Sequence, residues 1–434
     1  MDKYGLYDLE CDGFVYIEVR GGMYGHPEAG RLAHDELVAH LKPYGYEPTP
    51  LTPGLWVHKT NGITFTLVVD DFGIKYKGDN IQHLINALRD KYTITIDMSG
   101  SLFCGVSLEW RYKIGEVRCS MPGYIPKLLK KLNHQLPTKP QYSPHPAPTI
   151  TYGIKLQQAL KDDDSPILNQ SGNNLVRSIV GAALFIGRFI DMTLLVACNE
   201  IALNQTNSTM ATLNLCTWLL DYMSTYPDPS ITYKKSDMVL WVSSDSSYQS
   251  VSKSRSRVGG YHFLGNKPNN MKDVSIQRTF INAPIHVEAS ILRHVMGAAS
   301  ESEIAGGYVN ARDAVETRIA LMEMGHHQPP TPLELDNTTA YGIITKQLLP
   351  RRSKAIDMRY YWLRDRENQK QFNIYWSKGE NNLADYFTKH HSATHHKRMR
   401  KIYMSSNLIA ATTVDGISEF LRGCVNHKGL TDVM

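Results

Sequence analysis

Residues 65–74 read Phe65-Thr66-Leu67-Val68-Val69-Asp70-Asp71-Phe72-Gly73-Ile74, an apolar run that leads into two adjacent carboxylates. The run and the apolar residues after it predict two strands of a hairpin with Asp70-Asp71 at its turn. Two neighbouring acids repel each other, and a bound cation would keep both of them ionised. A solvated acidic turn explains the same pattern, so the rest of the chain has to distinguish the two interpretations.

The composition is that of an ordinary globular protein. The chain has 434 residues, 42% of them hydrophobic and 21% charged, with a net charge of +5, and a length of this kind predicts two to four domains of roughly 100–200 residues each. The six cysteines form no C-x-x-C pair, which argues against a disulfide framework or a zinc site and favours a reducing compartment. The most apolar region, 179–197, is interrupted by Arg188 and Asp191, and the N-terminus lacks a signal-peptide pattern. We therefore expect an intracellular protein without a membrane partner.

Hydrophobic periodicity predicts an α/β (α+β) chain in three structured parts. In the first part, strands are expected at 14–20, 55–58, 92–96, 102–110 and 117–120, and helices at 29–41, 81–92 and 125–132. Residues 134–148 contain five prolines and predict a linker. Three packed helices are expected at 175–185, 192–202 and 210–223. The last part predicts strands at 239–244, 258–264, 285–287, 333–335 and 372–376, with helices at 302–324, 338–347, 353–366 and from 383.

Four further carboxylates lie near the ends of these predicted elements. Asp245 ends the first strand of the last part, Glu303 lies in the first turn of the long helix, Asp336 follows a strand and Asp385 opens the last helix. Carboxylates that converge from such positions can hold two Mg²⁺ or Mn²⁺ ions for phosphodiester hydrolysis. Each acid alone has another explanation as a helix cap.

Several short motifs, in collinear order to about residue 402, resemble the C-terminal part of a copia-type LTR retrotransposon polyprotein. The motifs are Gly22-Met23-Tyr24-Gly25-His26-Pro27-Glu28-Ala29-Gly30, Val69-Asp70-Asp71, Gly123-Tyr124-Ile125, Val176-Arg177-Ser178-Ile179-Val180-Gly181, Ser244-Asp245-Ser246-Ser247-Tyr248, Ser300-Glu301-Ser302-Glu303, Leu335-Asp336-Asn337 and Leu383-Ala384-Asp385-Tyr386-Phe387-Thr388-Lys389. The resemblance implies a partial reverse transcriptase palm and thumb at 1–133, a Pro-rich linker at 134–170, a helical connection at 171–236, a ribonuclease H-like mixed-sheet domain at 237–402, and a tail at 403–434 without an assigned role.

The resemblance also implies a function. It predicts a ribonuclease H-type endonuclease that cleaves RNA in an RNA–DNA hybrid, with Asp245, Glu303, Asp336 and Asp385 as catalytic metal ligands. Within Ser300-Glu301-Ser302-Glu303 it selects Glu303, which precedes the apolar Ile304, and leaves Glu301 as a helix-start acid. Other retroelement proteins are implied as partners, in a cytoplasmic virus-like particle or in the nucleus.

The chain departs from the family pattern at two places. The family has a third polymerase aspartate on a strand well upstream of Gly22, and only 20 residues precede Gly21, so we expect an N-terminally truncated palm in which Asp70 and Asp71 form an incomplete site without primer extension. Many relatives also have a histidine in the loop before the last aspartate, where this chain has Lys378-Gly379-Glu380-Asn381-Asn382. We expect slower turnover for that reason, with cleavage retained.

Basic and aromatic residues alternate near the predicted helix 353–366. Phosphates and bases of a nucleic acid are the expected ligands of this group, which consists of Arg351, Arg352, Lys354, Arg359, Tyr361 and Arg364. An ordinary solvated helix is the alternative. A second basic set, Lys389, Lys397, Arg398, Arg400 and Lys401, also fits backbone binding, and the interspersed histidines 390, 391, 395 and 396 allow a zinc site as a minor alternative.

Three functional hypotheses stay open at this point. The first is the ribonuclease H enzyme with an inert partial polymerase. The second is an inactive retroelement remnant, and the third is a nucleic-acid-binding protein that has lost catalysis. The four acids favour the first hypothesis, and Mg²⁺-dependent cleavage of a hybrid would distinguish it from the others. The sequence does not indicate an oligomeric state.

Overall fold

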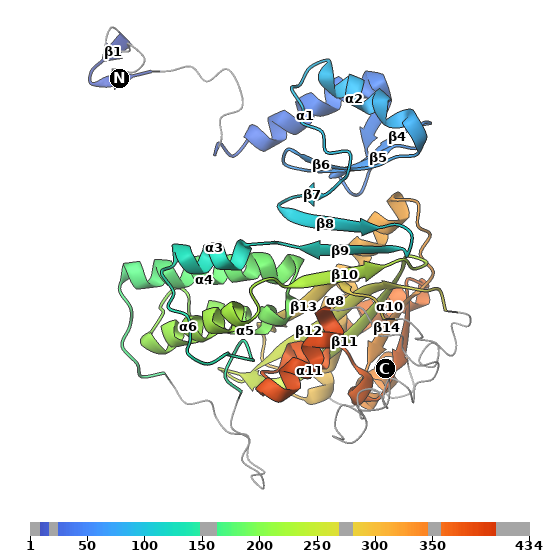
Figure 1. The fold of residues 1–434 in the computed structure, drawn as a ribbon. Helices are drawn as coiled ribbons and strands as arrows, with labels where there is room; N and C mark the ends of the chain where they lie inside the picture. The colour runs from blue at the N-terminus through green and yellow to red at the C-terminus, as the bar shows by residue number, and fades with distance from the viewer. Residues whose placement is uncertain (1–8, 17–24, 148–162, 269–280, 346–356, 405–434) are drawn as a thin grey trace. The chain divides into compact units, whose positions relative to one another are not determined.

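The computed structural model describes residues 9–16, 25–147, 163–268, 281–345 and 357–404 (Figure 1). Contacts divide the chain into two compact units, residues 1–98 and 99–434, and each unit has its own hydrophobic core. The domain boundaries expected at residues 133, 170 and 236 stay predictions. Segments from both sides of all three contribute to one hydrophobic core in the second unit.

The first unit contains an antiparallel sheet in the order β3-β4-β5-β6 and two helices. The elements of this unit are the ladder β1 (Glu10–Cys11) and β2 (Phe14–Val15), then α1 (Ala29–Leu41), η3 (Lys42–Tyr44), β3 (Tyr46–Pro48), β4 (Leu55–His58), β5 (Thr64–Val68), β6 (Asp71–Lys75), η4 (Gly78–Asn80) and α2 (Ile81–Arg89). Apolar side chains of the helices and of the sheet form its core, with Trp56, Phe65 and Leu84 fully or almost fully buried.

The acidic hairpin predicted from the sequence is present. Val68 pairs with Asp71, so Val69 and Asp70 form a two-residue turn between β5 and β6. Val69 has a φ of +58°, a left-handed conformation that costs a β-branched residue about 1–2 kcal/mol. The strand predicted at 92–96 is wrong, because Tyr92 and Ile94 pack against the core without pairing with the sheet. Only Phe14–Val15 of the strand predicted at 14–20 is found, and residues 17–20 lie outside the described residues.

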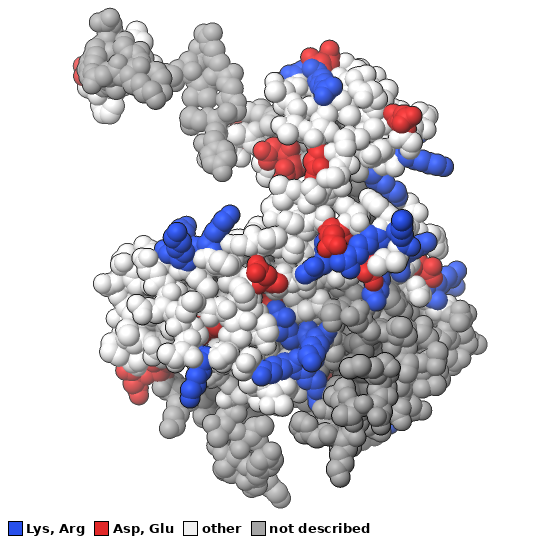
Figure 2. All heavy atoms as spheres, in the orientation of Figure 1, with Lys and Arg blue, Asp and Glu red and all other residues white. Residues whose placement is uncertain are grey.

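The second unit begins with another antiparallel sheet, ordered β10-β9-β8-β7. Its strands are β7 (Leu102–Phe103), β8 (Val106–Arg111), β9 (Glu116–Ser120) and β10 (Ser230–Lys234). A turn at Cys104-Gly105 divides the strand predicted at 102–110, and β10 was not predicted at all. In Figure 2 acidic and basic side chains are intermixed over this sheet, and ion pairs such as Arg111–Glu116 and Lys234–Glu116 join its strands.

Four helices pack together beside this sheet. They are α3 (Tyr124–Lys131), α4 (Gln170–Phe189), α5 (Leu195–Ala202), which follows η5 (Met192–Leu194), and α6 (Met210–Thr225). The three helices predicted between 175 and 223 are confirmed, with α4 longer than expected. Its N-cap is Asn169, whose side-chain oxygen accepts a hydrogen bond of 2.9 Å from the backbone N–H of Gly172.

A mixed five-stranded sheet with the order β13-β12-β11-β14-β15 confirms the predicted α/β class. The strands are β11 (Val239–Val251), β12 (Arg255–Gly265), β13 (Pro284–Ile291), β14 (Thr331–Leu335) and β15 (Phe372–Trp376). The first three pair antiparallel, whereas β14 lies parallel to both β11 and β15. The sheet is buried on both faces. Leu240 and Val242 contribute to one core, and Val239 and Trp241 to the other, as the two-residue period of a strand requires.

Helices cover the two faces of this sheet (Figure 1). The elements are α8 (Ala299–Glu323), α9 (Thr338–Ile344), α10 (Asp357–Asn368), η6 (Gly379–Asn381), η7 (Asp385–Thr388) and α11 (Ala393–Met404). Leu240 and Val242 share their core with side chains of α8, α9 and α10, whereas Val239 and Trp241 share theirs with α4, α5, α6 and α11.

The helix predicted from residue 383 is wrong. Residues 385–388 form only the short η7, and α11 begins later, at Ala393. The Thr388 hydroxyl donates to the carbonyl of Asp385 and to the side chain of Asp245, which holds this segment against the sheet. α11 packs on the other helices through Arg400, whose guanidinium lies 2.7 Å from the carboxylate of the buried Asp191. It also extends past the expected boundary at 402.

Candidate metal centre

Three of the four predicted catalytic carboxylates converge at one point of the mixed sheet. One oxygen each from Asp245, Glu303 and Asp336 lies within 4.8 Å of the others. The strand register accounts for two of them, because Ser243 pairs with Glu334 in parallel neighbours and two residues further on Asp245 stands beside Asp336. Asp245 is not at the end of its strand as predicted, since β11 continues to Val251 while its neighbour β14 stops at Leu335.

The long helix α8 brings in the third carboxylate. α8 begins at Ala299, so Glu303 lies beyond the first turn in which it was predicted, and Glu301 is the first-turn acid. The helix approaches the sheet closely at Gly306, where a Cβ would lie 3.3 Å from the carbonyl oxygen of Asp245. This close approach lets the backbone N–H of Ser246 donate a hydrogen bond of 3.2 Å to Glu303 Oε1.

These carboxylates are removed from water and incompletely paired. Asp245 and Glu303 are each only 5% exposed. Asp245 Oδ2 accepts a hydrogen bond of 2.7 Å from the Thr388 hydroxyl, whereas Glu303 Oε2 is buried without a hydrogen-bond partner in the described part of the chain. A buried, unpaired carboxylate oxygen is costly unless a cation or a proton compensates for it, so the donor set fits a hard divalent cation.

The pKa values of these carboxyl groups also show that their charged forms are disfavoured. Burial raises the pKa of Asp245 to about 7, and the charges of Asp385 and Asp336 add to the effect. Burial, together with Asp245 and Asp336, also raises the pKa of Glu303 well above its ordinary value. The pKa of Asp336 is raised by burial and by the charges of Asp385 and Glu334. A bound divalent cation would counteract all of these effects at once.

Asp385, the fourth predicted carboxylate, lies at the rim of this cluster. It is close enough for its charge to raise the pKa values of Asp245 and Asp336, but it is not one of the three converging groups. Its side chain is 38% exposed and forms an ion pair with Lys389. The structure therefore places three acids together and leaves the fourth beside them, bound to a lysine.

Several supporting residues of this centre were not predicted from the sequence. The buried carboxylate of Glu334 accepts hydrogen bonds from the hydroxyls of Ser243 and Ser377. At Gly379 a Cβ would lie 2.9 Å from Asp336 Oδ2, so the glycine leaves space for this acid. Thr388 belongs to a motif that was noted, but its bond to Asp245 depends on the tertiary fold. No local signal distinguishes these residues from ordinary strand and turn positions.

The acidic hairpin of the first unit has a different environment. Asp70 and Asp71 are exposed, and no cluster of three metal donors includes either of them among the described residues of that unit. The predicted polymerase metal site at this turn stays a prediction.

The predicted nucleic-acid-binding residues differ in their surroundings. Arg351, Arg352 and Lys354 lie outside the described residues. Tyr361 is 58% exposed on α10. Arg364 donates hydrogen bonds of 3.3 and 3.4 Å to the carbonyls of Ile344 and Ile343, and thus fastens α10 to the end of α9.

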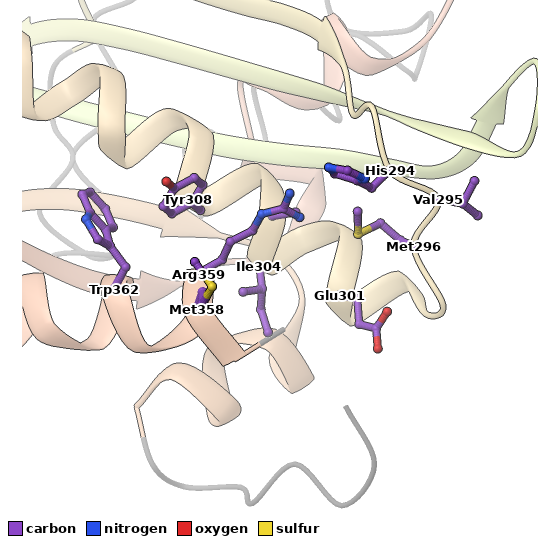
Figure 3. A pocket seen from close by; sticks show the side chains of 10 residues that line it. His294, Val295, Met296, Glu301, Ile304, Tyr308, Met358, Arg359 and Trp362 are labelled. Carbon is purple, nitrogen blue, oxygen red and sulfur yellow. The ribbon is translucent and has the colours of Figure 1, made fainter. Parts of the chain in front are cut away.

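Arg359, the remaining member of this group, lines a cavity of about 550 Å³ between α8, α10 and the segment that follows β13 (Figure 3). The cavity is mainly apolar and aromatic, and its walls are formed by His294, Val295, Met296, Glu301, Ile304, Ala305, Tyr308, Met358, Arg359 and Trp362. Ile304, one of these wall residues, directly follows Glu303 in the chain, but none of the three clustered carboxylates lines the cavity.

The second basic set is largely engaged within the protein. Arg400 is paired with Asp191, and the Lys397 ammonium lies 3.2 Å from the centre of the Tyr142 ring. The neighbouring histidines also have structural contacts, since His390 stacks on His145 and His396 accepts or donates hydrogen bonds with two tyrosines. No metal-donor cluster within the described residues contains these histidines.

Comparison with known proteins indicates a retroelement origin for this sequence. The chain is similar to a retrotransposon polyprotein over most of its length. One such relative is the "Retrovirus-related Pol polyprotein from transposon TNT 1-94" of Nicotiana tabacum, which is 20% identical over 402 residues. The match covers 88% of this chain but only 28% of the relative. It supports a retroelement-derived protein, and the chain spans less than a third of the relative's own length.

No family model matches the chain. Of the helices within the described ranges, none is both long and apolar enough to cross a bilayer.

Proposed function

We propose that this chain is a copia-type, retroelement-derived nuclease that cleaves the RNA strand of an RNA–DNA hybrid in a reaction that depends on Mg²⁺ or Mn²⁺. The observation that carries the proposal is the convergence of three carboxylates, two of them buried, with Glu303 Oε2 left without a hydrogen bond. The mixed sheet and the similarity to a Pol polyprotein support it.

The residues of the cluster have distinct proposed roles. Asp245, Glu303 and Asp336 would hold two divalent ions, which supply an activated water and stabilise the leaving oxygen when bound. Thr388 holds the Asp245 carboxylate in place through its hydrogen bond. Asp385 would be a further ligand at the rim if Lys389, its ion-pair partner, bound a phosphate of the substrate instead.

The surface beside the cluster would bind the hybrid. Arg359 and Tyr361 lie on α10 and offer a cation that lines the cavity and an exposed aromatic ring. Cations bind phosphates and rings stack on sugars or bases, so binding should weaken steeply with salt. Other proteins encoded by the same element are further proposed partners.

Cleavage of a labelled RNA–DNA hybrid by the full chain, with and without Mg²⁺, tests the proposal. Asp245→Asn and Asp336→Asn should each reduce cleavage to the buffer background. Asp365→Asn, on an exposed position of α10, is the matched control and should cleave like the unmodified chain. Unchanged cleavage in the first two variants would refute the site. Hybrid binding without any Mg²⁺-dependent cleavage would refute the enzyme and favour a binding protein.

A further inference from the structure

A second group of potential metal donors lies apart from the carboxylate cluster, between β13 and α8. His286 and Glu288 occupy the same face of β13, and Asp313 projects from α8, the helix that packs over the sheet. His286 Nε2 lies 3.8 Å from Glu288 Oε2 and 3.7 Å from Asp313 Oδ2. One donor atom from each of the three residues lies within 4.8 Å of the other two.

A buried histidine on the neighbouring strand accompanies this group. His262 pairs with His286 across β12 and β13, and the centroids of the two rings are 4.9 Å apart. Asn310 fixes the tautomer of His262. The Asn310 Nδ2 donates to the carbonyls of Gly259 and Gly306, so the Asn310 Oδ1 is the atom that accepts a hydrogen bond of 2.9 Å from His262 Nε2. The remaining nitrogen, Nδ1, then carries a lone pair, and it is buried without a hydrogen-bond partner.

The backbone leaves space for these polar groups. Gly260 stands opposite Glu288 in the β12–β13 ladder. A Cβ at Gly260 would lie 1.8 Å from Asn310 Oδ1 and 2.9 Å from the Cβ of Glu288. Any other residue would therefore displace Asn310, which orients His262.

We propose that His286, Glu288 and Asp313 bind one divalent ion of the zinc class, with a water in the open position that donates a hydrogen bond to His262 Nδ1. A histidine nitrogen with two carboxylates suits Zn²⁺ better than Mg²⁺, because Mg²⁺ prefers oxygen donors. The second-layer bond from Asn310 to His262 matches the way metal sites orient imidazoles. Such an ion would fasten the edge strand β13 to α8, and this site is independent of the proposed nuclease centre.

Without a metal, the group is held together by charge. Burial lowers the pKa of His286, but the neighbouring carboxylates of Asp313 and Glu288 outweigh this effect and raise the pKa to about 9. The other charged group at the site is Arg312, which is paired with Asp313 at 3.3 Å, and burial keeps His262 neutral with a pKa of about 4. Zinc therefore has to displace one proton from His286 at neutral pH.

Calorimetric titration of the full chain with Zn²⁺ tests the site. A large excess of Mg²⁺ is added to compete with zinc at the carboxylate centre, and buffers of different ionisation enthalpy report the protons released. We expect one zinc ion per chain, with proton release where His286 is protonated, and an affinity that rises with pH. His286→Gln and Asp313→Asn should each weaken binding at least tenfold or so. His327→Gln, an exposed histidine in the same unit, should bind zinc normally.

Two results would overturn the proposal. One is zinc binding that is unchanged in both variants. The other is the absence of stoichiometric zinc binding in the unmodified chain, in which case His286 only forms ion pairs. Thermal melting shows whether the variants fold. If they do not fold, the visible absorption of Co²⁺ bound to the unmodified chain tests the proposal. The proposed site predicts absorption bands of tetrahedral or five-coordinate Co²⁺, which Zn²⁺ abolishes and Mg²⁺ does not.

Discussion

Replacing Asp245 with asparagine should stabilise the metal-free protein at alkaline pH, although it removes a proposed metal ligand. In the unmodified chain, burial and the charges of Asp385 and Asp336 raise the pKa of Asp245 from 3.8 to about 7. Between these values the native state holds a proton that the unfolded state has released. The free energy of unfolding therefore falls as pH rises through this range and stays low above it.

The expected magnitude follows from that pKa. Each pH unit between 3.8 and about 7 lowers the stability of the native state by about 1.4 kcal/mol, which amounts to about 4 kcal/mol above pH 7. Asparagine carries no charge, and its side-chain oxygen can still accept the hydrogen bond from Thr388. Glu303 and Asp336 still repel each other in the variant, so only part of the electrostatic cost is removed. We expect the free energy of unfolding to increase by roughly 1–4 kcal/mol at about pH 8 and by less at about pH 5.

Urea denaturation in EDTA at both pH values measures this effect, with Asp365→Asn as the control for loss of an exposed carboxylate. Mg²⁺ should then stabilise the unmodified chain and have little effect on Asp245→Asn, because only the former retains the full ligand set. An Asp245→Asn variant that is no more stable than the unmodified chain at pH 8 would refute the reasoning. A gain of equal size at both pH values would refute it as well, since charge would then not be the cause.

Three further substitutions test the packing, each by the same denaturation assay. Gly259→Ala should lower the free energy of unfolding by about 1–3 kcal/mol and slow hybrid cleavage. The new Cβ would lie 2.4 Å from the carbonyl oxygen of Ala384, so the segment before η7 has to move. Unchanged stability would contradict this close approach. Gly181→Ala, on the exposed face of α4 with nothing within 4 Å of the new Cβ, should instead gain about 0.5–1 kcal/mol. Arg400→Met should lower the free energy of unfolding by about 3–5 kcal/mol, since it leaves the carboxylate of Asp191, which is 2% exposed, without its ion-pair partner. A near-neutral effect would contradict a stabilising role of this ion pair.

Local patterns predicted most of the individual elements. The β5–β6 hairpin, the helix at 29–41 and the strands of the mixed sheet have clear two- or 3.6-residue periods, and their existence depends mainly on neighbouring residues. Predictions failed where pairing over a long distance decides the outcome. β10 is a strand because its residues pair with β9 more than a hundred positions earlier, and 92–96 is not a strand because nothing pairs with it.

The site shows the same division. The residue types and motif order identified Asp245, Glu303, Asp336 and Asp385, but periodicity contains no information on which of them meet. The parallel register of β11 and β14, and the close approach of α8 at Gly306, bring three together and leave Asp385 paired with Lys389 at the rim. Likewise, a basic run predicts cations near nucleic acid without showing that Arg364 and Arg400 are engaged inside the fold.

Residue types and short-range spacing therefore suffice to predict the class of fold, most of its elements and the acids available for metal chemistry. They do not show which carboxylates share one buried space, which of their oxygens lacks a hydrogen-bond partner, or that His286, Glu288 and Asp313 form a second donor group. Those properties arise from strand register and helix packing, which join residues that are far apart in the chain.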